Sequence, residues 1–185
     1  CEIFEPRHPS PHGYLVVYLH DVTLHTLSDL TELRRLCDDL GLRVVSPLAK
    51  CSWWTVRVFS AFSSELTAEQ FVVQRVASYA ADKWGVRPPR MALMGTGMGG
   101  QGALRIAFKH PDLFPIVAAL SPAVDYHLLL REKDQALSQL YPSEEHARQD
   151  TAILHVHPLY YPRNIFFCCD PRDTAWHEGA ERLAM

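Results

Sequence analysis

Short apolar runs alternate with longer amphipathic stretches along the chain. Residues 15–19, LVVYL, form a continuous apolar run of the kind that fills a buried parallel strand. Four further apolar runs predict strands at residues 42–45, 91–94, 116–120 and 165–168.

Helical periodicity fills the gaps between these runs. In the first gap, Thr26 and Asp29 can cap a helix whose leucines share one face, and Gly41 can end it. In the next gap, the capping box Thr67-Ala-Glu-Gln70 starts a second helix. The predicted helices cover residues 26–40, 67–84, 99–109 and 174–185.

This order of elements predicts an α/β fold. Strands that alternate with helices at these spacings form βαβ units, which give a mainly parallel sheet with helices on both faces. We expect one domain over residues 1–185, in which residues 122–163 break the rhythm as an excursion over the strand ends. Binding sites of open α/β sheets lie at the carboxyl ends of the strands.

Composition and net charge limit the classes of binding partner that the chain is expected to have. The 185 residues are 48% hydrophobic and 21% charged, which is ordinary for a globular domain. The net charge of −3 gives no electrostatic case for nucleic acid or a membrane surface. Five cysteines without a spaced disulfide framework favour reduced thiols and a cytoplasmic location. The first residue is Cys1 and not Met, so the start could be trimmed.

The glycine-rich segment GTGMGGQG, at residues 95–102, follows the strand predicted at residues 91–94 and opens a helix. Serine hydrolases place their nucleophile at the third position of a Gly-x-Ser-x-Gly turn between such elements. Gly95 and Gly99 match the outer glycines, but Gly97 holds the nucleophile position and has no side chain that could attack. Thr96 is adjacent and would point away from a site built around Gly97.

Two other interpretations of the sequence are weaker. The spacing Gly95-x-Gly97-x-x-Gly100 matches a dinucleotide-binding turn, but Asp112 comes too early for the acid of that fingerprint. His155 and His157 share one side of an extended segment without a third ligand at a recognisable spacing. We therefore expect neither a cofactor nor a metal.

The longest specific match lies around the glycine turn. Residues 92–125, ALMGTGMGGQGALRIAFKHPDLFPIVAALSPAVD, resemble the turn region of esterase D-type α/β-hydrolases, which include S-formylglutathione hydrolases. The family usually has Gly-x-Ser-Met-Gly-Gly-x-Gly-Ala followed by His-Pro-Asp-x-Phe. Weaker matches are VVYLHD, CSWWTVR and IFFCCDPRD, at residues 16–21, 51–57 and 165–173.

The resemblance implies a role for each matching position. Gly97 stands at the nucleophile position, and Asp173 stands at the catalytic acid position, with Asp170 as second choice. The implied oxyanion-hole backbone groups belong to Met98, Asp21 and Val22. Trp53 and Trp54 are candidates for the wall of a substrate pocket, although two adjacent tryptophans more often place one in the core and one at the surface. His20 is a further pocket candidate; it either shapes the oxyanion loop or is a hydrogen-bonded histidine at the strand end.

The chain departs from the family pattern at two catalytic positions. Serine is absent at position 97, and the family's histidine lies beyond one further helix and strand after the acid. His177 is too close to Asp173 to serve, so the last sheet strand and the C-terminal part are expected to be missing. Gly97 could also be an engineered substitution, and a longer chain could supply the missing base.

The sequence therefore predicts a carboxylic ester hydrolase lineage that is catalytically impaired and takes a small ester or acyl ligand. The alternative is a non-catalytic ligand-binding or scaffolding domain on the same fold. Homo-oligomerisation is left open.

Overall fold

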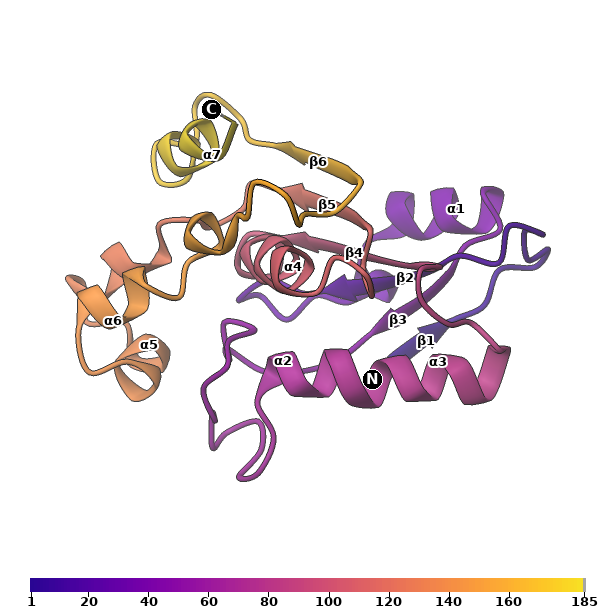
Figure 1. Cartoon of the computed structure of the whole chain (residues 1–185), viewed down its shortest axis with the longest axis horizontal. Helices are drawn as coiled ribbons and strands as arrows, with labels where there is room; N and C mark the ends of the chain where they lie inside the picture. Colours follow the sequence, from indigo (N-terminus) through magenta and orange to yellow (C-terminus); the bar gives the residue numbers. More distant parts are fainter. Residues whose placement is uncertain (185) are drawn as a thin grey trace.

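A computed structural model describes residues 1–184 and contains a mixed sheet within that range. The six strands lie in the order β1-β3-β2-β4-β5-β6 (Figure 1). β1 is antiparallel to β3, and the remaining neighbours are parallel. The strands are β1 (Glu2–Phe4), β2 (Leu15–Leu19), β3 (Arg43–Ser46), β4 (Met91–Thr96), β5 (Ile116–Leu120) and β6 (Asn164–Cys168).

Seven α-helices connect or follow these strands within residues 1–184: α1 (Thr31–Asp39), α2 (Ala68–Gln70), α3 (Ala77–Trp84), α4 (Met98–Lys109), α5 (Gln135–Leu140), α6 (Glu144–Arg148) and α7 (His177–Ala184). A π-helical segment, Phe71–Val76, joins α2 to α3. Short 3-10 turns occupy Leu27–Asp29, Tyr126–Leu130 and Ala152–His155.

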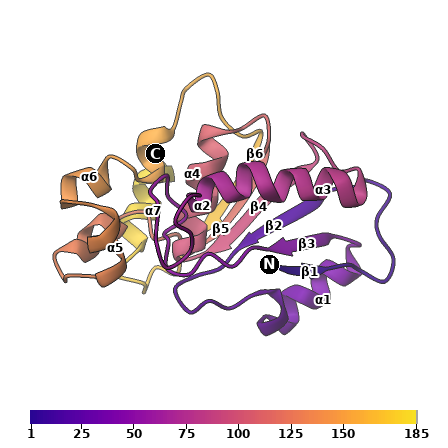
Figure 2. The same cartoon turned by 90° about the horizontal axis from the view of Figure 1, so that it is seen from below.

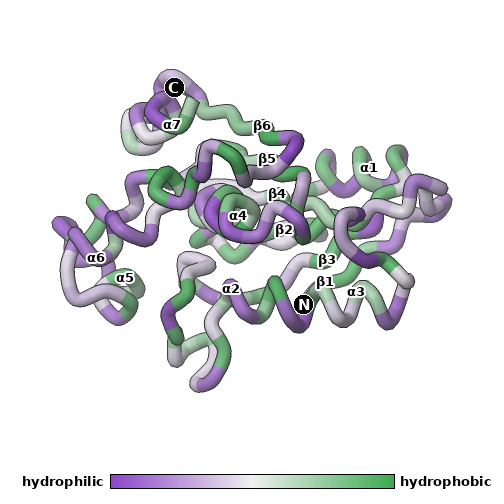
Figure 3. The backbone as a smooth tube through the Cα atoms, in the orientation of Figure 1, coloured by the Kyte–Doolittle hydropathy of each residue, from purple (hydrophilic) through white to green (hydrophobic). Residues whose placement is uncertain are grey.

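Helices cover both faces of the sheet, which confirms the predicted α/β class. On one face, α3 and α4 pack against β2, β4 and β5 in the main core, which contains residues such as Val17, Leu93 and Leu104. On the other face, α1 covers a smaller cluster around Tyr18 and Val44. Figure 2 shows α3 and α1 on opposite sides of the strands. Hydrophilic and hydrophobic residues alternate within the turns of both helices, as expected of helices with one buried side (Figure 3).

The sheet register brings the residues after β2 and β4 together. β2 and β4 pair in parallel over five positions, and the last pair joins Leu19 to Gly95. Asp21 and Gly97 each lie two residues beyond this pair. Their neighbourhood therefore follows from the register, at the edge where α/β folds place their sites. Figures 1 and 2 both show α5 and α6 beyond one end of the strands.

Two predicted helices differ in detail. The helix expected over residues 26–40 is a 3-10 turn followed by α1, because Leu30 has a non-helical backbone with φ of −108° and ψ of 73°. The last helix begins at His177 and not at Thr174. The Asp173 carboxylate accepts the backbone N–H groups of Ala175 and Trp176 in a turn before it.

β1 was not predicted, because three residues at a sheet edge carry too little periodicity to stand out. Among residues 1–184, no helix combines the length and apolar character that crossing a membrane requires.

Candidate functional site

Gly97 forms the turn between β4 and α4. Its φ of 50° and ψ of −115° lie where a side chain is strained and glycine is not. Its N–H donates to the Leu120 carbonyl over 3.0 Å, and its own carbonyl accepts the N–H groups of Gln101 and Ala123. These bonds fix the turn against the end of β5.

The first turn of α4 lies unusually close to β2. A Cβ added at Gly99 would stand 2.5 Å from the carbonyl carbon of Leu19, which is backbone and cannot move aside. Only glycine permits this approach. The contact aligns the N-terminus of α4 with the loop that follows β2.

The Asp21 carboxylate fills the space beside Gly97. Its Oδ1 accepts the backbone N–H of Met98 over 2.8 Å, although the two residues are 77 positions apart. A Cβ added at Gly97 would lie 2.7 Å from Cγ of Asp21 and closer still to Oδ1. The carboxylate therefore stands where a side chain at position 97 would project.

A cavity of about 850 Å³ opens above this turn, at the carboxyl ends of β4 and β5. Its wall combines carboxylates, aromatic rings, amides and small residues from the strand ends, from α5 and from the loop before α7. The lining residues are Asp21, Val22, Cys51, Trp53, Phe59, Thr96, Gly97, Met98, Leu120, Ser121, Ala123, Leu129, Asp134, Gln135, Ala136, Gln139, Asp173 and Trp176.

The structure brings six of the nine predicted site residues to this cavity. They come from four separate stretches of sequence: Asp21, Val22, Trp53, Gly97, Met98 and Asp173. Asp170 is not among the lining residues. It is exposed and forms an ion pair with Arg172 at 2.8 Å.

His20 and Trp54 lie behind the cavity wall and are fully buried. The Nε2 of His20 accepts the Ala49 N–H over 3.1 Å, which assigns the ring proton to Nδ1, the atom that donates to the Asp21 carbonyl. Burial lowers the pKa of His20. Trp54 donates its indole N–H to the His20 carbonyl. Both residues hold the loop that carries Asp21.

Sequence reasoning missed several lining residues. Ser121 follows directly on β5 and takes a φ of 43°, so its position after a strand was a usable signal. Asp134 and Trp176 lie in irregular segments, where no periodicity predicts which side chains turn inward. Cys51 stands two residues before Trp53, and the sequence predicts only a reduced thiol there. Burial raises the pKa of this thiol, and the nearby Asp134 and Asp21 raise it further.

A second group of carboxylates lies inside the protein, under α4. Arg105 is fully buried and its guanidinium forms ion pairs with both Glu69 and Asp150. Glu69 also contacts Lys109 at 2.6 Å and His110 at 3.1 Å. Burial alone raises the pKa of Glu69, but the His110 hydrogen bond and the charges of Arg105 and Lys109 outweigh it and lower the pKa to about 2.

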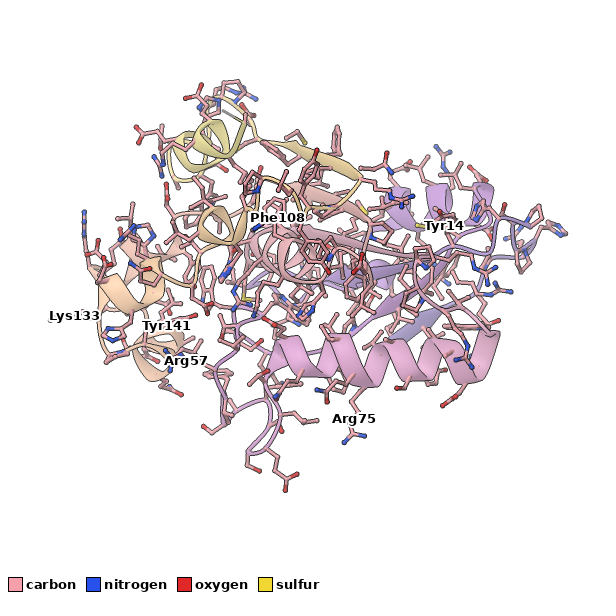
Figure 4. All side chains as sticks on the ribbon, in the orientation of Figure 1. Tyr14, Arg57, Arg75, Phe108, Lys133 and Tyr141 are labelled. Atoms are coloured by element: carbon pink, nitrogen blue, oxygen red, sulfur yellow. The ribbon has the colours of Figure 1, made fainter. Side chains whose placement is uncertain are left out.

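This buried network continues towards the cavity wall. The hydroxyl of Tyr141 donates to Asp150 over 2.5 Å and lies 3.0 Å from the hydroxyl of Tyr126. The Tyr126 ring stacks on Trp53 with centroids 5.0 Å apart. The Tyr141 ring is also contacted by Arg57, whose guanidinium lies 5.8 Å from the ring centre (Figure 4). The network thus braces the wall on which Trp53 stands.

Within residues 1–184, no three His, Cys, Asp or Glu side chains stand close enough to share a metal ion.

Sequence comparison relates the chain to known proteins over almost its whole length. The model of the Esterase family, described as "Putative esterase", matches residues 2–184. A stretch of 90 residues is 31% identical to the diacylglycerol acyltransferase/mycolyltransferase Ag85B of Mycobacterium avium. That stretch covers 46% of this chain but only 27% of the relative, so the chain spans a minor part of that protein.

Solved structures share the fold at low sequence identity. The S-formylglutathione hydrolase FrmB of Staphylococcus aureus superposes with a TM-score of 0.70 at 15% identity, over 98% of this chain and 77% of FrmB. MPT51 (FbpC1) of Mycobacterium tuberculosis gives a TM-score of 0.64 at 17% identity, over 100% of this chain and 82% of MPT51. These likenesses support the α/β-hydrolase fold.

Proposed function

We propose, since the chain belongs to the Esterase family, that it keeps the family's cavity as a binding site for a small ester or acyl ligand without hydrolysing it by a serine mechanism. One observation carries the proposal: the Asp21 carboxylate stands beside Gly97 and holds the Met98 N–H.

Ester hydrolysis of this type needs a nucleophile, a base that takes its proton and N–H donors for the oxyanion. Gly97 supplies no nucleophile. No histidine is among the residues that line the cavity. The Met98 N–H, which would face the oxyanion, already donates to a carboxylate. An oxyanion placed there would meet a negative charge in place of a free donor.

Other nucleophilic side chains at the cavity are not activated. The Thr96 hydroxyl lies 3.2 Å from the Tyr18 hydroxyl, which is a poor base. Burial, Asp134 and Asp21 all raise the pKa of Cys51, and this disfavours the reactive thiolate. The Ser121 hydroxyl has no histidine beside it in the cavity wall that could take its proton.

The remaining features favour binding. The cavity volume of about 850 Å³ lies within the range of small-molecule sites. Trp53 and Phe59 are buried and offer apolar walls, while Gln135 and Gln139 offer amide groups. Trp53 is held in place from behind by the stacked Tyr126 ring. A braced aromatic wall is suited to a bound ligand because little ordering is left to be done on binding.

The test combines turnover with binding. Release of p-nitrophenolate from p-nitrophenyl butyrate is followed for the native chain, for Gly97→Ser and for Asp21→Gly/Gly97→Ser. Tryptophan fluorescence of the native chain is titrated with a panel of short-chain esters of different charge, because Trp53 and Trp176 line the cavity.

We expect saturable quenching by at least one ester and no turnover by the native chain. Gly97→Ser stays inactive because Asp21 blocks the turn, and the double variant does not turn over because the cavity wall has no histidine. Turnover by the native chain, or no saturable binding by any ester, contradicts the proposal.

A further inference from the structure

We infer that the cavity selects a cationic ligand, an alkylammonium compound that also carries an ester or acyl oxygen. The inference rests on the proposed function, because it names the ligand class of the same cavity.

The charge of the cavity wall is the first reason. Asp21, Asp134 and Asp173 line the cavity from three separate parts of the chain, and Lys, Arg and His are absent from the lining residues. None of the three carboxylates forms an ion pair with any residue in the range 1–184. A negative wall without a cation of its own attracts a positive ligand and repels a carboxylate or phosphate.

The carboxylates are held in place before any ligand arrives. Asp21 accepts the Met98 N–H over 2.8 Å, and Asp134 accepts the Leu137 N–H over 2.8 Å. Asp173 accepts two N–H groups of the turn before α7, over 3.2 and 3.3 Å. Each side chain is half-buried, which weakens solvent screening at the cavity. Their charges therefore act on the ligand at little cost in ordering.

The arrangement suits an organic cation better than a metal ion. The three carboxylates do not gather into a group that could hold a metal, so their charge is spread over the wall. The same wall contains the aromatic side chains of Trp53 and Trp176. A diffuse alkylammonium group is attracted to aromatic faces as well as to carboxylates.

Trp53 gives a second reason. Its side chain lines the cavity and is only 2% exposed, and the Tyr126 ring stacks against it with centroids 5.0 Å apart. The indole is therefore fixed before a ligand arrives, and among aromatic side chains an indole attracts a cation most strongly. The ester or acyl oxygen of the ligand comes from the function proposed above, to which the cationic group is added.

Two probes of equal shape and different charge test the inference. Acetylcholine carries a trimethylammonium group, and 3,3-dimethylbutyl acetate replaces its nitrogen with carbon. Both are titrated by tryptophan fluorescence and calorimetry at low salt. We expect acetylcholine to bind at least about tenfold more tightly, and the difference to shrink as the ionic strength rises.

Asp134→Asn and Asp170→Asn form a matched pair of variants. Asparagine can keep the cap at position 134, so the fold is retained while one cavity charge is removed. We expect Asp134→Asn to weaken acetylcholine severalfold without changing the neutral probe. Asp170→Asn leaves both unchanged, because Asp170 lies outside the cavity and pairs with Arg172.

The outcomes separate this inference from the proposed function. Equal affinity for the two probes, or tighter binding of the neutral one, overturns the inference and leaves the binding function intact. Binding of neither probe or of any other short ester overturns both. An equal loss in Asp134→Asn and Asp170→Asn also overturns the inference, because the charge of the wall would then not act locally.

Discussion

Two groups of carboxylates lie near the α4 helix, one beside its middle and one at its N-terminus, and the fold pairs them differently. Glu69 and Asp150 are buried and share the guanidinium of Arg105. Asp21 lies at the helix N-terminus and faces the cavity, and within residues 1–184 its carboxylate is partnered only by a backbone N–H. The chain thus supplies its own cations to one group and leaves the other without them.

This difference indicates that the buried group stabilises the fold, whereas the cavity group is available to a ligand. A buried carboxylate without a cation costs several kcal/mol, so the inner group is completed by the fold itself. The cavity group tolerates its unpaired charge because water or a ligand can reach it. Its residues come from loops and turns that follow β2 and β6 or precede α5, where α/β proteins concentrate their binding residues.

The largest expected effect comes from breaking the inner group. Arg105→Met leaves two buried carboxylates without their shared cation and should lower the free energy of unfolding by about 3–5 kcal/mol. Urea unfolding measures it. Arg172→Met is the control, because this exposed arginine forms a surface ion pair with Asp170 and its loss should leave stability unchanged. An Arg105→Met protein of native stability would refute the structural role.

Low pH should also destabilise the chain through this buried carboxylate group. The pKa of Glu69 falls from its ordinary 4.5 to about 2 on folding, so its contribution of about 3 kcal/mol is complete above pH 4.5 and is lost as the pH falls through about 2. Unfolding measured from pH 6 down to about 2 should show this decline. The decline should be shallower in Glu69→Gln; equal slopes would show that Glu69 is not the group responsible.

A smaller effect is expected at the cavity floor. Gly97→Ala should destabilise the chain by about 1–3 kcal/mol, because of its positive φ and the contact with the Asp21 carboxylate. Part of this cost should disappear when Asp21 is glycine. A double-mutant cycle of Gly97→Ala and Asp21→Gly measures that part. A coupling of zero would mean that Asp21 does not fill the space beside Gly97.

The smallest effect is expected for a charge of the cavity wall. Asp134→Asn keeps a capping side chain, so the free energy of unfolding should change by no more than about 0.5 kcal/mol. Asp150→Asn removes a buried partner of Arg105 and should cost clearly more. Both variants are measured in the same urea titration. Comparable losses in the free energy of unfolding would show that the cavity carboxylates and the buried carboxylates do not differ in their contribution to stability.

The sequence predicted those parts of the fold that depend on local pattern. The strand from Leu15 to Leu19 has the predicted bounds, because a buried parallel strand reads as a continuous apolar run. The turn around Gly97 was visible because Gly95 and Gly99 have the spacing of a tight strand-to-helix turn. The class of the fold followed from the order of the elements.

Contacts between residues far apart in the chain could not be predicted from the local sequence pattern. Nothing in the local pattern indicates that the Asp21 side chain bonds to the Met98 N–H, because the sheet register alone brings these residues together. Asp21 was predicted only for its backbone. Asp134 and Trp176 sit in segments without periodicity, so their place in the cavity wall depends on tertiary packing. His20 was also a candidate from the sequence, yet both nitrogens of its ring are hydrogen-bonded to backbone groups, of Asp21 and of Ala49, and not directed to the cavity.

The most direct test of the proposed function is the intact mass of the native chain during exposure to excess p-nitrophenyl acetate, with peptide mapping of any adduct. The account predicts no acetyl group on a residue of the cavity wall. An acetyl group on Thr96, Ser121 or Cys51 that forms and clears as p-nitrophenolate is released would contradict it and identify a working nucleophile.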